Sequence, residues 1–184
     1  VFSMVRFGNV IGSSGSVIPL FTKQLNEGGP ITITHKDIYR FFMTIEEAAQ
    51  LVIQAAEIAK GNEVFLLDMG EQVKITDLAK QLIKINGLSL KDANNPNGDI
   101  EIKYIGLRQG EKLKEELLID SKAKKTIHPL IFSAKENSIP LEDLNKKLQE
   151  LDRYCKEQNL SAVLNSLKKI MPEWINSYSK KTNF

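Results

Sequence analysis

Arginine is scarce in this sequence, and its scarcity marks the residues best suited to bind phosphate. Four of the 25 basic residues are arginines, and the others are lysines. A guanidinium group is a planar fork that pairs with phosphate through two hydrogen bonds, whereas the lysine ammonium group is a point charge. Arg6, Arg40 and Arg108 lie beside glycine or aromatic residues. Arg153 lies in a Lys- and Glu-rich stretch and is expected on the surface.

Arg108 lies in the segment Gly106–Lys112, which follows an apolar run typical of a strand. In α/β proteins, ligands bind at loops that follow the carboxyl ends of strands. The glycines on either side of Arg108 permit close approach of the backbone, and Glu111 could accept hydrogen bonds from ribose hydroxyls. A loop ion pair between Arg108 and Glu111, without any ligand, explains the same spacing equally well.

Arg40 lies between Tyr39 and the run Phe41–Met43. A cation in this position would face a phosphate while the aromatic rings line a pocket. A cation–π contact, or a carboxylate partner at the edge of the core, is an equally good interpretation.

The segment Gly8–Ser16 is rich in glycine and serine and follows a strand pattern. It is not a Walker loop, because no Lys-Ser or Lys-Thr pair follows the glycines, and it lacks the Gly-x-Gly-x-x-Gly spacing of dinucleotide-binding loops. Asn9 suits sugar hydroxyls because its amide both donates and accepts hydrogen bonds, although asparagine is also a common turn residue. Ser16 is expected either to cap a helix or to bind an anion at its start.

No catalytic residue and no metal site are expected from this sequence. His35 and His128 lie far apart in turn-like contexts. The single cysteine, Cys155, has no neighbours that would activate a thiolate and is expected to be a buried packing residue. The sequence contains no Tyr-x-x-x-Lys motif and no evident Ser–His–Asp grouping.

The hydrophobic pattern alternates strands with helices, which predicts α/β packing. Strands are expected over residues 1–7, 31–34, 63–68 and 100–105, and helices over about 16–27, 45–60, 76–86, 141–156 and 162–170. Thr44 and Glu47 form a capping-box pattern, and Thr76 is expected to cap the next helix. The helix from residue 45 is apolar around most of its circumference, so it is expected to be largely buried. The stretch 89–99 is expected to be a loop.

Composition is typical of a globular chain, since 42% of the 184 residues are hydrophobic and 26% are charged. No stretch approaches about 18 uncharged apolar residues, so no transmembrane helix is expected. A net charge of +2 does not favour nucleic acid as a partner. The chain opens inside a strand pattern without an initiator methionine, and it is therefore expected to be a fragment.

Three motifs in order resemble one protein family. They are Arg-Phe-Gly-Asn-Val-Ile-Gly-Ser-Ser-Gly-Ser-Val-Ile-Pro-Leu-Phe, then Thr-His-x-x-x-x-Arg-Phe-Phe-Met-Thr-Ile-x-Glu-Ala, and then Gly-Leu-Arg-x-Gly-Glu-Lys-Leu. The chain is similar, over roughly residues 2–175, to the bacterial polysaccharide-biosynthesis branch of the extended short-chain dehydrogenase/reductases (SDRs), the UDP-N-acetylglucosamine 4,6-dehydratases. The likeness is strongest to their larger, membrane-anchored members.

The resemblance implies the C-terminal part of an extended SDR, a truncated Rossmann-type α/β fold with a small mixed sheet and paired C-terminal helices. Residues 1–138 would form the substrate-binding part, including the late Rossmann strands. Residues 139–184 would form a helical appendage.

The resemblance also implies a role for individual residues in binding a UDP-sugar. Asn9 would lie against the sugar, and the backbone of Gly8 near the nicotinamide. Arg40 and Arg108 would clamp the diphosphate, while Glu111 would hold the ribose. Further nucleotide contacts would come from Ser16, Val17 and Ile18 at a helix start and from Thr32 and Thr34 along the uracil.

The Gly-rich cofactor loop and the Lys-bearing catalytic segment of this family have no counterpart in the chain, which is therefore expected to be inactive alone. NAD or NADP would bind the full-length protein. The expected partners are a UDP-sugar and a missing N-terminal Rossmann half, with a homo-oligomer as an open alternative and no nucleic acid. The expected location is the cytoplasm, and an inner-membrane anchor in the full-length parent stays open. Gln109 stands where relatives commonly have proline, a change expected to loosen the turn.

Two other functions stay open at this point. A UDP-sugar 4-epimerase of the same superfamily would carry the same motifs, because the residues that distinguish the two enzymes lie upstream. A non-catalytic module could instead bind an acidic macromolecule through residues 121–184, which carry 12 basic and seven acidic residues. Charge runs of this kind are more often solvated surfaces.

Overall fold

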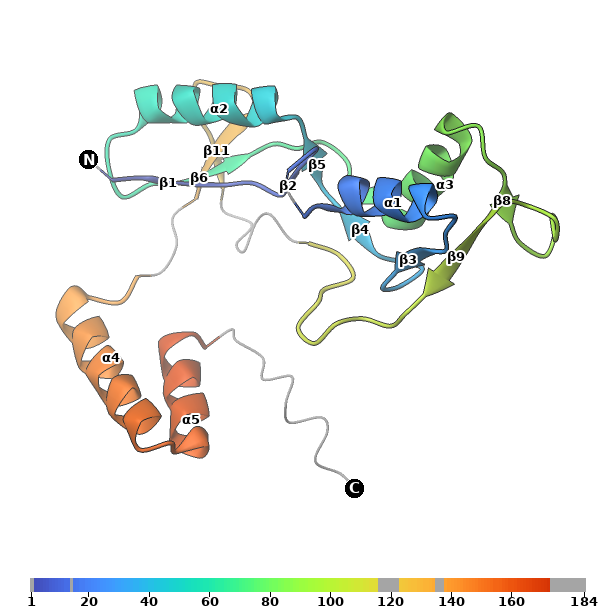
Figure 1. The fold of residues 1–184 in the computed structure, drawn as a ribbon. Coiled ribbons are helices and arrows are strands. Elements are labelled where there is room, and N and C mark those ends of the chain that lie inside the picture. The colour runs from blue at the N-terminus through green and yellow to red at the C-terminus, as the bar shows by residue number, and fades with distance from the viewer. Residues whose placement is uncertain (1, 14, 116–122, 135–137, 173–184) are drawn as a thin grey trace. The chain divides into compact units, whose positions relative to one another are not determined.

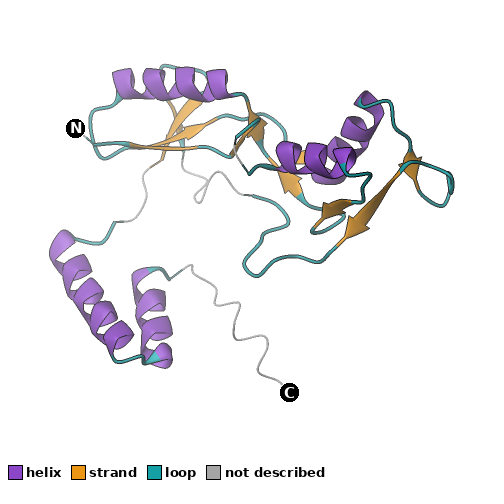
Figure 2. Ribbon diagram, viewed as in Figure 1, coloured by secondary structure: helices purple, strands orange, loops and turns teal. Residues whose placement is uncertain are grey.

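The computed structural model describes residues 2–13, 15–115, 123–134 and 138–172. The chain divides into two compact units, residues 1–136 and residues 137–184, and each is described by itself. Strands and helices alternate through most of the first unit, and the second is helical (Figures 1 and 2). Among the residues described, no helix combines the length and the apolar character needed to cross a membrane.

A four-stranded mixed sheet forms one half of the first unit, in the order β1-β6-β11-β10. β1 (Met4–Arg6) runs parallel to β6 (Val64–Leu67), and β11 (Ile131–Ala134) runs antiparallel to β6. β10 (Lys124–Lys125) pairs with β11. All four residues of β6 are buried, which explains their unbroken apolar run. The expected strands over residues 1–7 and 63–68 are confirmed in shorter form, with Val1 outside the described residues, whereas β10 and β11 were not expected.

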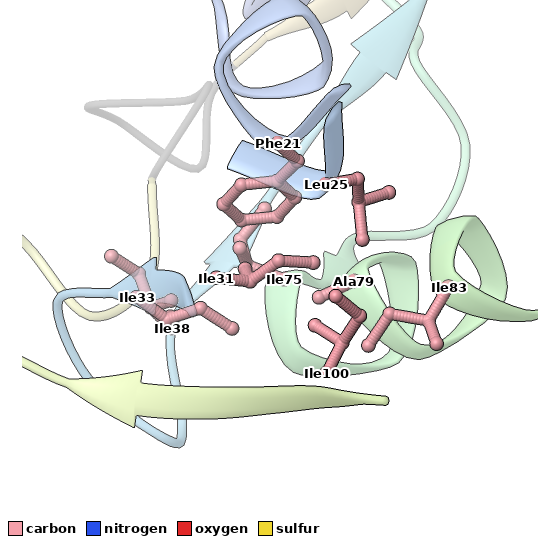
Figure 3. Packing of buried hydrophobic residues seen from close by; sticks show 9 residues of the cluster. All are labelled: Phe21, Leu25, Ile31, Ile33, Ile38, Ile75, Ala79, Ile83 and Ile100. Atoms are coloured by element: carbon pink, nitrogen blue, oxygen red, sulfur yellow. The ribbon is translucent and has the colours of Figure 1, made fainter. Parts of the chain in front are cut away.

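A second, three-stranded parallel sheet has the order β3-β9-β8. β3 (Ile31–Ile33) and β9 (Ile100–Tyr104) were expected, but β8 (Leu90–Lys91) lies within the segment expected to be a loop. The helices α1 (Val17–Asn26) and α3 (Ile75–Ile85) pack beside this sheet. Figure 3 shows their shared core, which consists of Phe21, Leu25, Ile31, Ile33, Ile38, Ile75, Ala79, Ile83 and Ile100.

Two short ladders link the halves of the first unit. β2 (Asn9–Val10) pairs in parallel with β5 (Phe42–Met43), and β4 (Tyr39–Arg40) pairs antiparallel with β7 (Val73–Lys74). None of these two-residue strands was expected from the sequence. They fix the aromatic segment around Arg40 between the two sheets.

The helix α2 (Ile45–Ile58) begins with the expected capping box. The Thr44 side chain accepts a hydrogen bond from the Glu47 backbone, and the Glu47 carboxylate accepts one from the Thr44 backbone at 2.8 Å. The expectation that this helix is largely buried is wrong. Only its Ala48, Leu51 and Ala55 face is buried, while Ile45 and Ile53 are exposed, because the described residues cover one side of the helix only.

The helix α3 begins one residue earlier than expected. Lys74 occupies the N-cap position, so the prediction that Thr76 caps this helix is wrong. Thr76 lies in the first turn, is buried, and donates its hydroxyl proton to the Lys36 carbonyl at 3.1 Å. The end of the helix agrees with the sequence, because Gly87 follows it with a positive φ of 72°.

The second unit is a pair of helices, α4 (Leu141–Lys156) and α5 (Leu160–Ile170). Asn159, one of two expected caps, accepts a hydrogen bond from the Ala162 backbone at 3.1 Å. Cys155 is exposed, which corrects the expectation of a buried cysteine. The reason is that α4 has no buried residue at all.

Replacing Thr44 by alanine is expected to lower the free energy of unfolding by about 1 kcal/mol, because the first turn of α2 loses its side-chain cap. Chemical denaturation measures this loss, and Thr44→Ser is the control that retains the hydroxyl. Equal stability of the wild type and the alanine variant would contradict the capping role.

The same box makes a pH-dependent contribution. Hydrogen bonds from the Thr44 backbone and side chain lower the pKa of Glu47. A lowered pKa in the folded state means that this contribution is present above the pKa of the unfolded chain and is lost as the pH falls through the folded pKa. We expect NMR titration to show a higher pKa for Glu47 in the Thr44→Ala variant than in the wild type.

Candidate functional site

A cavity of about 620 Å³ lies where α1, β2, β3 and the loop after β9 meet. Gly8 lines it, together with eight of the nine residues expected to contact a UDP-sugar: Asn9, Ser16, Val17, Thr32, Thr34, Arg40, Arg108 and Glu111. Ile18, the ninth, is not a lining residue, since neighbouring residues of a helix point about 100° apart. The fold therefore brings two arginines that are distant in the sequence to one cavity.

Strand pairing explains why these residues meet. β3 and β9 are parallel neighbours, and Ile33 pairs with Tyr104 where the two strands end. The residues that follow, Thr34 and the loop 105–115, therefore leave the sheet at the same edge. The loop is then tied to β4, because the Tyr39 backbone N–H donates to the Leu113 carbonyl at 2.8 Å.

The Glu111 carboxylate joins three of these segments. Its Oε1 accepts hydrogen bonds from Thr34 Oγ1 at 2.9 Å and from Arg40 Nη2 at 3.4 Å. Its Oε2 accepts from the Arg108 backbone N–H at 3.0 Å. Three of the roughly four acceptor positions of a carboxylate are thus filled from within the chain. Glu111 holds the loop against β3 and β4.

The Arg40 guanidinium is enclosed by protein acceptors, and its side chain is only 13% exposed. Nε pairs with Glu115 at 3.2 Å, and Nη2 with Glu111. Nη1 donates to the carbonyls of Tyr39 and Leu113. Of the two interpretations of Arg40 from the sequence, a carboxylate partner at the edge of the core is the arrangement found.

Arg108 is placed differently. It is exposed, and its backbone N–H rather than its guanidinium bonds Glu111. Within the described part of the chain, the ion pair of Glu111 is with Arg40 instead of with Arg108. The Arg108 fork thus stands at the cavity wall without the carboxylate that the sequence suggested.

Ser16 occupies the N-cap position of α1 but does not cap it. Its hydroxyl oxygen is buried and has no hydrogen-bond partner among the described residues. Buried polar groups are nearly always paired, so an orphan hydroxyl on a cavity wall needs an explanation. An anion at the start of α1 would supply one, because the first backbone N–H groups of a helix lack intrahelical partners.

Gln24 is a residue whose role the sequence did not reveal. Its Nε2 donates to Thr32 Oγ1 at 2.7 Å, and its Oε1 accepts from the Thr32 backbone N–H at 3.0 Å. The polar groups of Thr32 are therefore already engaged, and the Thr34 hydroxyl is engaged by Glu111. The spacing of Gln24 in α1 gave no signal, because the contact depends on how α1 lies beside β3.

Gly8 is held by close packing. A Cβ atom there would lie 3.0 Å from Phe41 Cβ and 3.1 Å from Met69 Sδ. Its backbone N–H donates to the Met69 sulfur at 2.8 Å. This packing supplies a reason for glycine in addition to any approach of a ligand.

Apolar residues complete the cavity wall: Val10, Leu20, Phe21, Ile33, Ile38, Phe42, Ile75 and Ile105. Leu20 and Ile105 are also exposed on the surface. An apolar wall with a few polar groups is typical of small-molecule sites. Exposed leucine and isoleucine beside a glycine-rich loop is the signal that could have indicated these residues.

The histidines lie elsewhere. His35 accepts a hydrogen bond from the Asp37 backbone at 3.1 Å, as a turn residue does. His128 lines a second cavity of about 560 Å³, together with Asp68 and residues of α2. No group of three or more metal-ligating side chains occurs within the ranges that the structure describes.

Lysines flank the cavity through Tyr39. Lys74 and Lys114 lie over its ring, with Nζ at 5.8 and 5.0 Å from the ring centroid. A hydrogen bond with Asp37 raises the pKa of Lys74 above its usual value. The region therefore stays cationic around the enclosed Arg40.

A family model for polysaccharide biosynthesis proteins matches residues 1–136. Three relatives share the region. The capsular polysaccharide biosynthesis protein CapD of Staphylococcus aureus is 55% identical over 70% of this chain and 20% of CapD. The UDP-N-acetylglucosamine 4,6-dehydratase (inverting) of Campylobacter jejuni is 33% identical over 82% of this chain and 43% of that protein. A UDP-glucose 4-epimerase of Rickettsia akari is 36% identical over 64% of this chain and 31% of that protein.

One solved structure, that of Pen from Bacillus thuringiensis, superimposes with a TM-score of 0.61 at 38% sequence identity. It covers 80% of this chain and 48% of that protein. The chain thus spans between a fifth and half the length of these relatives.

Replacing Glu111 by alanine is expected to lower the free energy of unfolding by roughly 2 kcal/mol, because the Arg40 charge and the Arg108 backbone lose their acceptor. We also expect faster hydrogen exchange at the Arg108 and Tyr39 amides. The exposed neighbour Lys112, replaced by alanine, is the matched control. If both variants exchange at the wild-type rate, Glu111 does not hold the loop.

Proposed function

Because the chain belongs to the polysaccharide biosynthesis protein family, a branch of the extended SDRs, we propose that its cavity binds a UDP-sugar. Nucleotide-sugar dehydratases and epimerases are among its relatives. The observation that carries the proposal is the meeting of two arginines, a buried unpaired serine hydroxyl and the start of α1 at one cavity. Residues 1–136 would be the substrate-binding part.

The diphosphate would lie between Arg108 and the start of α1. Arg108 offers its guanidinium from an exposed loop, and Ser16 offers a hydroxyl with no other partner. The partial positive charge at a helix N-terminus favours an anion there. Three independent features therefore favour negative charge at the same wall.

Arg40 would join the diphosphate only after an exchange of partners. Four hydrogen bonds or ion pairs engage it, so at most one of its five N–H groups is left while Glu115 stays in place. A phosphate that displaces Glu115 would gain a bidentate contact with a side chain already held in position.

The remaining residues would orient the ligand. β3, with Thr32 and Thr34, would run beside the uracil, and Glu111 would use its remaining acceptor position for the ribose. Asn9 would face the hexose. UDP-N-acetylglucosamine is the sugar nucleotide we propose, since the C. jejuni relative carries it in its name. Orientation of a reacting centre in this way can supply roughly 7–11 kcal/mol of a barrier.

NAD or NADP is the cofactor that this superfamily uses. Here only Gly8 is proposed to contact it, and the sequence contains no Gly-x-Gly-x-x-Gly loop for its diphosphate. The residues of this chain therefore fit one edge of a nicotinamide site and no more. When bound, the cofactor would supply the hydride chemistry, while this chain would hold the sugar.

Replacing Arg108 by alanine is expected to weaken UDP-N-acetylglucosamine binding at least tenfold, because a charge-assisted contact is worth roughly 1.5–3 kcal/mol. Isothermal titration calorimetry of the full-length protein measures this effect. Lys112→Ala, on the same loop, removes a charge outside the cavity and should bind normally. Equal weakening in both variants would reduce the effect to overall charge and reject the proposed contact.

A dehydratase and a 4-epimerase differ in their product, and both are represented among the relatives. We propose the dehydratase, and we expect the full-length protein to convert UDP-N-acetylglucosamine to a 4-keto-6-deoxy sugar nucleotide. Mass spectrometry detects this product through the loss of one water. Recovery of a 4-epimer of unchanged mass would establish the alternative instead.

A further inference from the structure

The helix pair of the second unit presents an apolar surface that no described residue covers. Leu141 and Leu148 of α4 are 71% and 45% exposed, and Leu160 and Met171, at the two ends of α5, are 69% and 46% exposed. The family match ends at residue 136 and leaves this unit without an assigned role. We call the surface formed by these four residues the hairpin face.

Helix geometry places these residues on one side of the pair. The half-buried residues of α4, such as Leu144 and Leu151, face α5. At about 100° per residue, Leu141 and Leu148 lie roughly a quarter-turn from that line, and Leu160 and Met171 lie a quarter-turn from the corresponding line of α5. Both quarter-turns have the same rotational sense. Because a short loop makes the helices antiparallel, the two stripes form one continuous face.

Two helices alone do not bury enough apolar surface for a stable unit. α4 has no buried residue, and Ser166 is the buried residue of α5. A helix must bury its apolar stripe against another element to be stable. A second layer over the hairpin face would complete a four-helix bundle.

Charges along the borders of this face are complementary to those of a second copy. Asp152 borders the outer edge of α4, and Lys168 borders the outer edge of α5, by the same 100° rule. A two-fold axis parallel to the helices would lay α4 over the partner's α5 with both interhelical loops at one end. Asp152 and Lys168 then lie about 6 Å apart along the axis, given a rise of about 1.5 Å per residue. A lysine side chain bridges that offset.

We propose that the hairpin face binds the hairpin face of a second copy of this chain. The two copies form a four-helix bundle in which Asp152 of each copy pairs with Lys168 of the other. Self-complementarity of this kind is the requirement for a two-fold interface. The cavity residues take no part in it, so this inference is independent of UDP-sugar binding.

Sedimentation velocity of the full chain over a range of concentrations tests the interface. We expect reversible dimers, and Leu148→Gln should raise the dimer dissociation constant at least tenfold. The single variants Asp152→Lys and Lys168→Asp should each raise it at least fivefold, because each places like charges together. The double variant Asp152→Lys/Lys168→Asp should recover most of the lost affinity.

Two matched variants separate this contact from a general effect of charge. Glu150→Lys and Lys169→Asp make the same reversals on the opposite sides of α4 and α5, and they should dimerise like the wild type. Circular dichroism establishes that all variants keep their helices. A monomer at every concentration overturns the proposal, as does a dimer that is insensitive to Leu148→Gln or a double variant no tighter than the weaker single variant.

Discussion

A single carboxylate, that of Glu111, holds the candidate site together. It accepts hydrogen bonds from a strand end, from a buried guanidinium and from the backbone of the loop that carries Arg108. These three segments belong to separate elements and have no sheet pairing that would fix all of them at once. Without an acceptor at this point, the Arg40 charge would be partly desolvated and the loop would lose its anchor on β3 and β4. The position of both arginines therefore depends on one acidic side chain.

The fold arranges its sheets so that this carboxylate can work. Parallel pairing of β3 with β9 brings Thr34 and the loop to one edge, and the short β4–β7 and β2–β5 ladders carry Arg40 and Asn9 toward it. The apolar cluster around Phe21 and Ile31 fixes α1 beside the sheet, with its N-terminus at the cavity. Packing thus positions the walls, and hydrogen bonds position the polar groups.

The sequence predicted the long elements and the meeting of the two arginines, because helical periodicity, caps and motif order are local or familial signals. It did not predict β10, β11 or the two-residue strands, since such short segments carry no periodic pattern of their own. The partners of Arg40 were also beyond local reasoning: Glu115 contacts it only because the loop folds back onto β4. Thr76 misled for a related reason, since its hydroxyl bonds Lys36 rather than the start of its own helix.

The enclosed state of Arg40 has a consequence for selectivity. A guanidinium that already holds two carboxylates behaves as an ion exchanger, because an incoming anion must outcompete them. Chloride or acetate carries one negative charge and offers nothing better than the glutamates do. A diphosphate carries more charge and matches the planar fork, so it can displace Glu115 where simpler anions fail. Two acidic side chains would thus act as a filter that keeps abundant small anions out of the cavity.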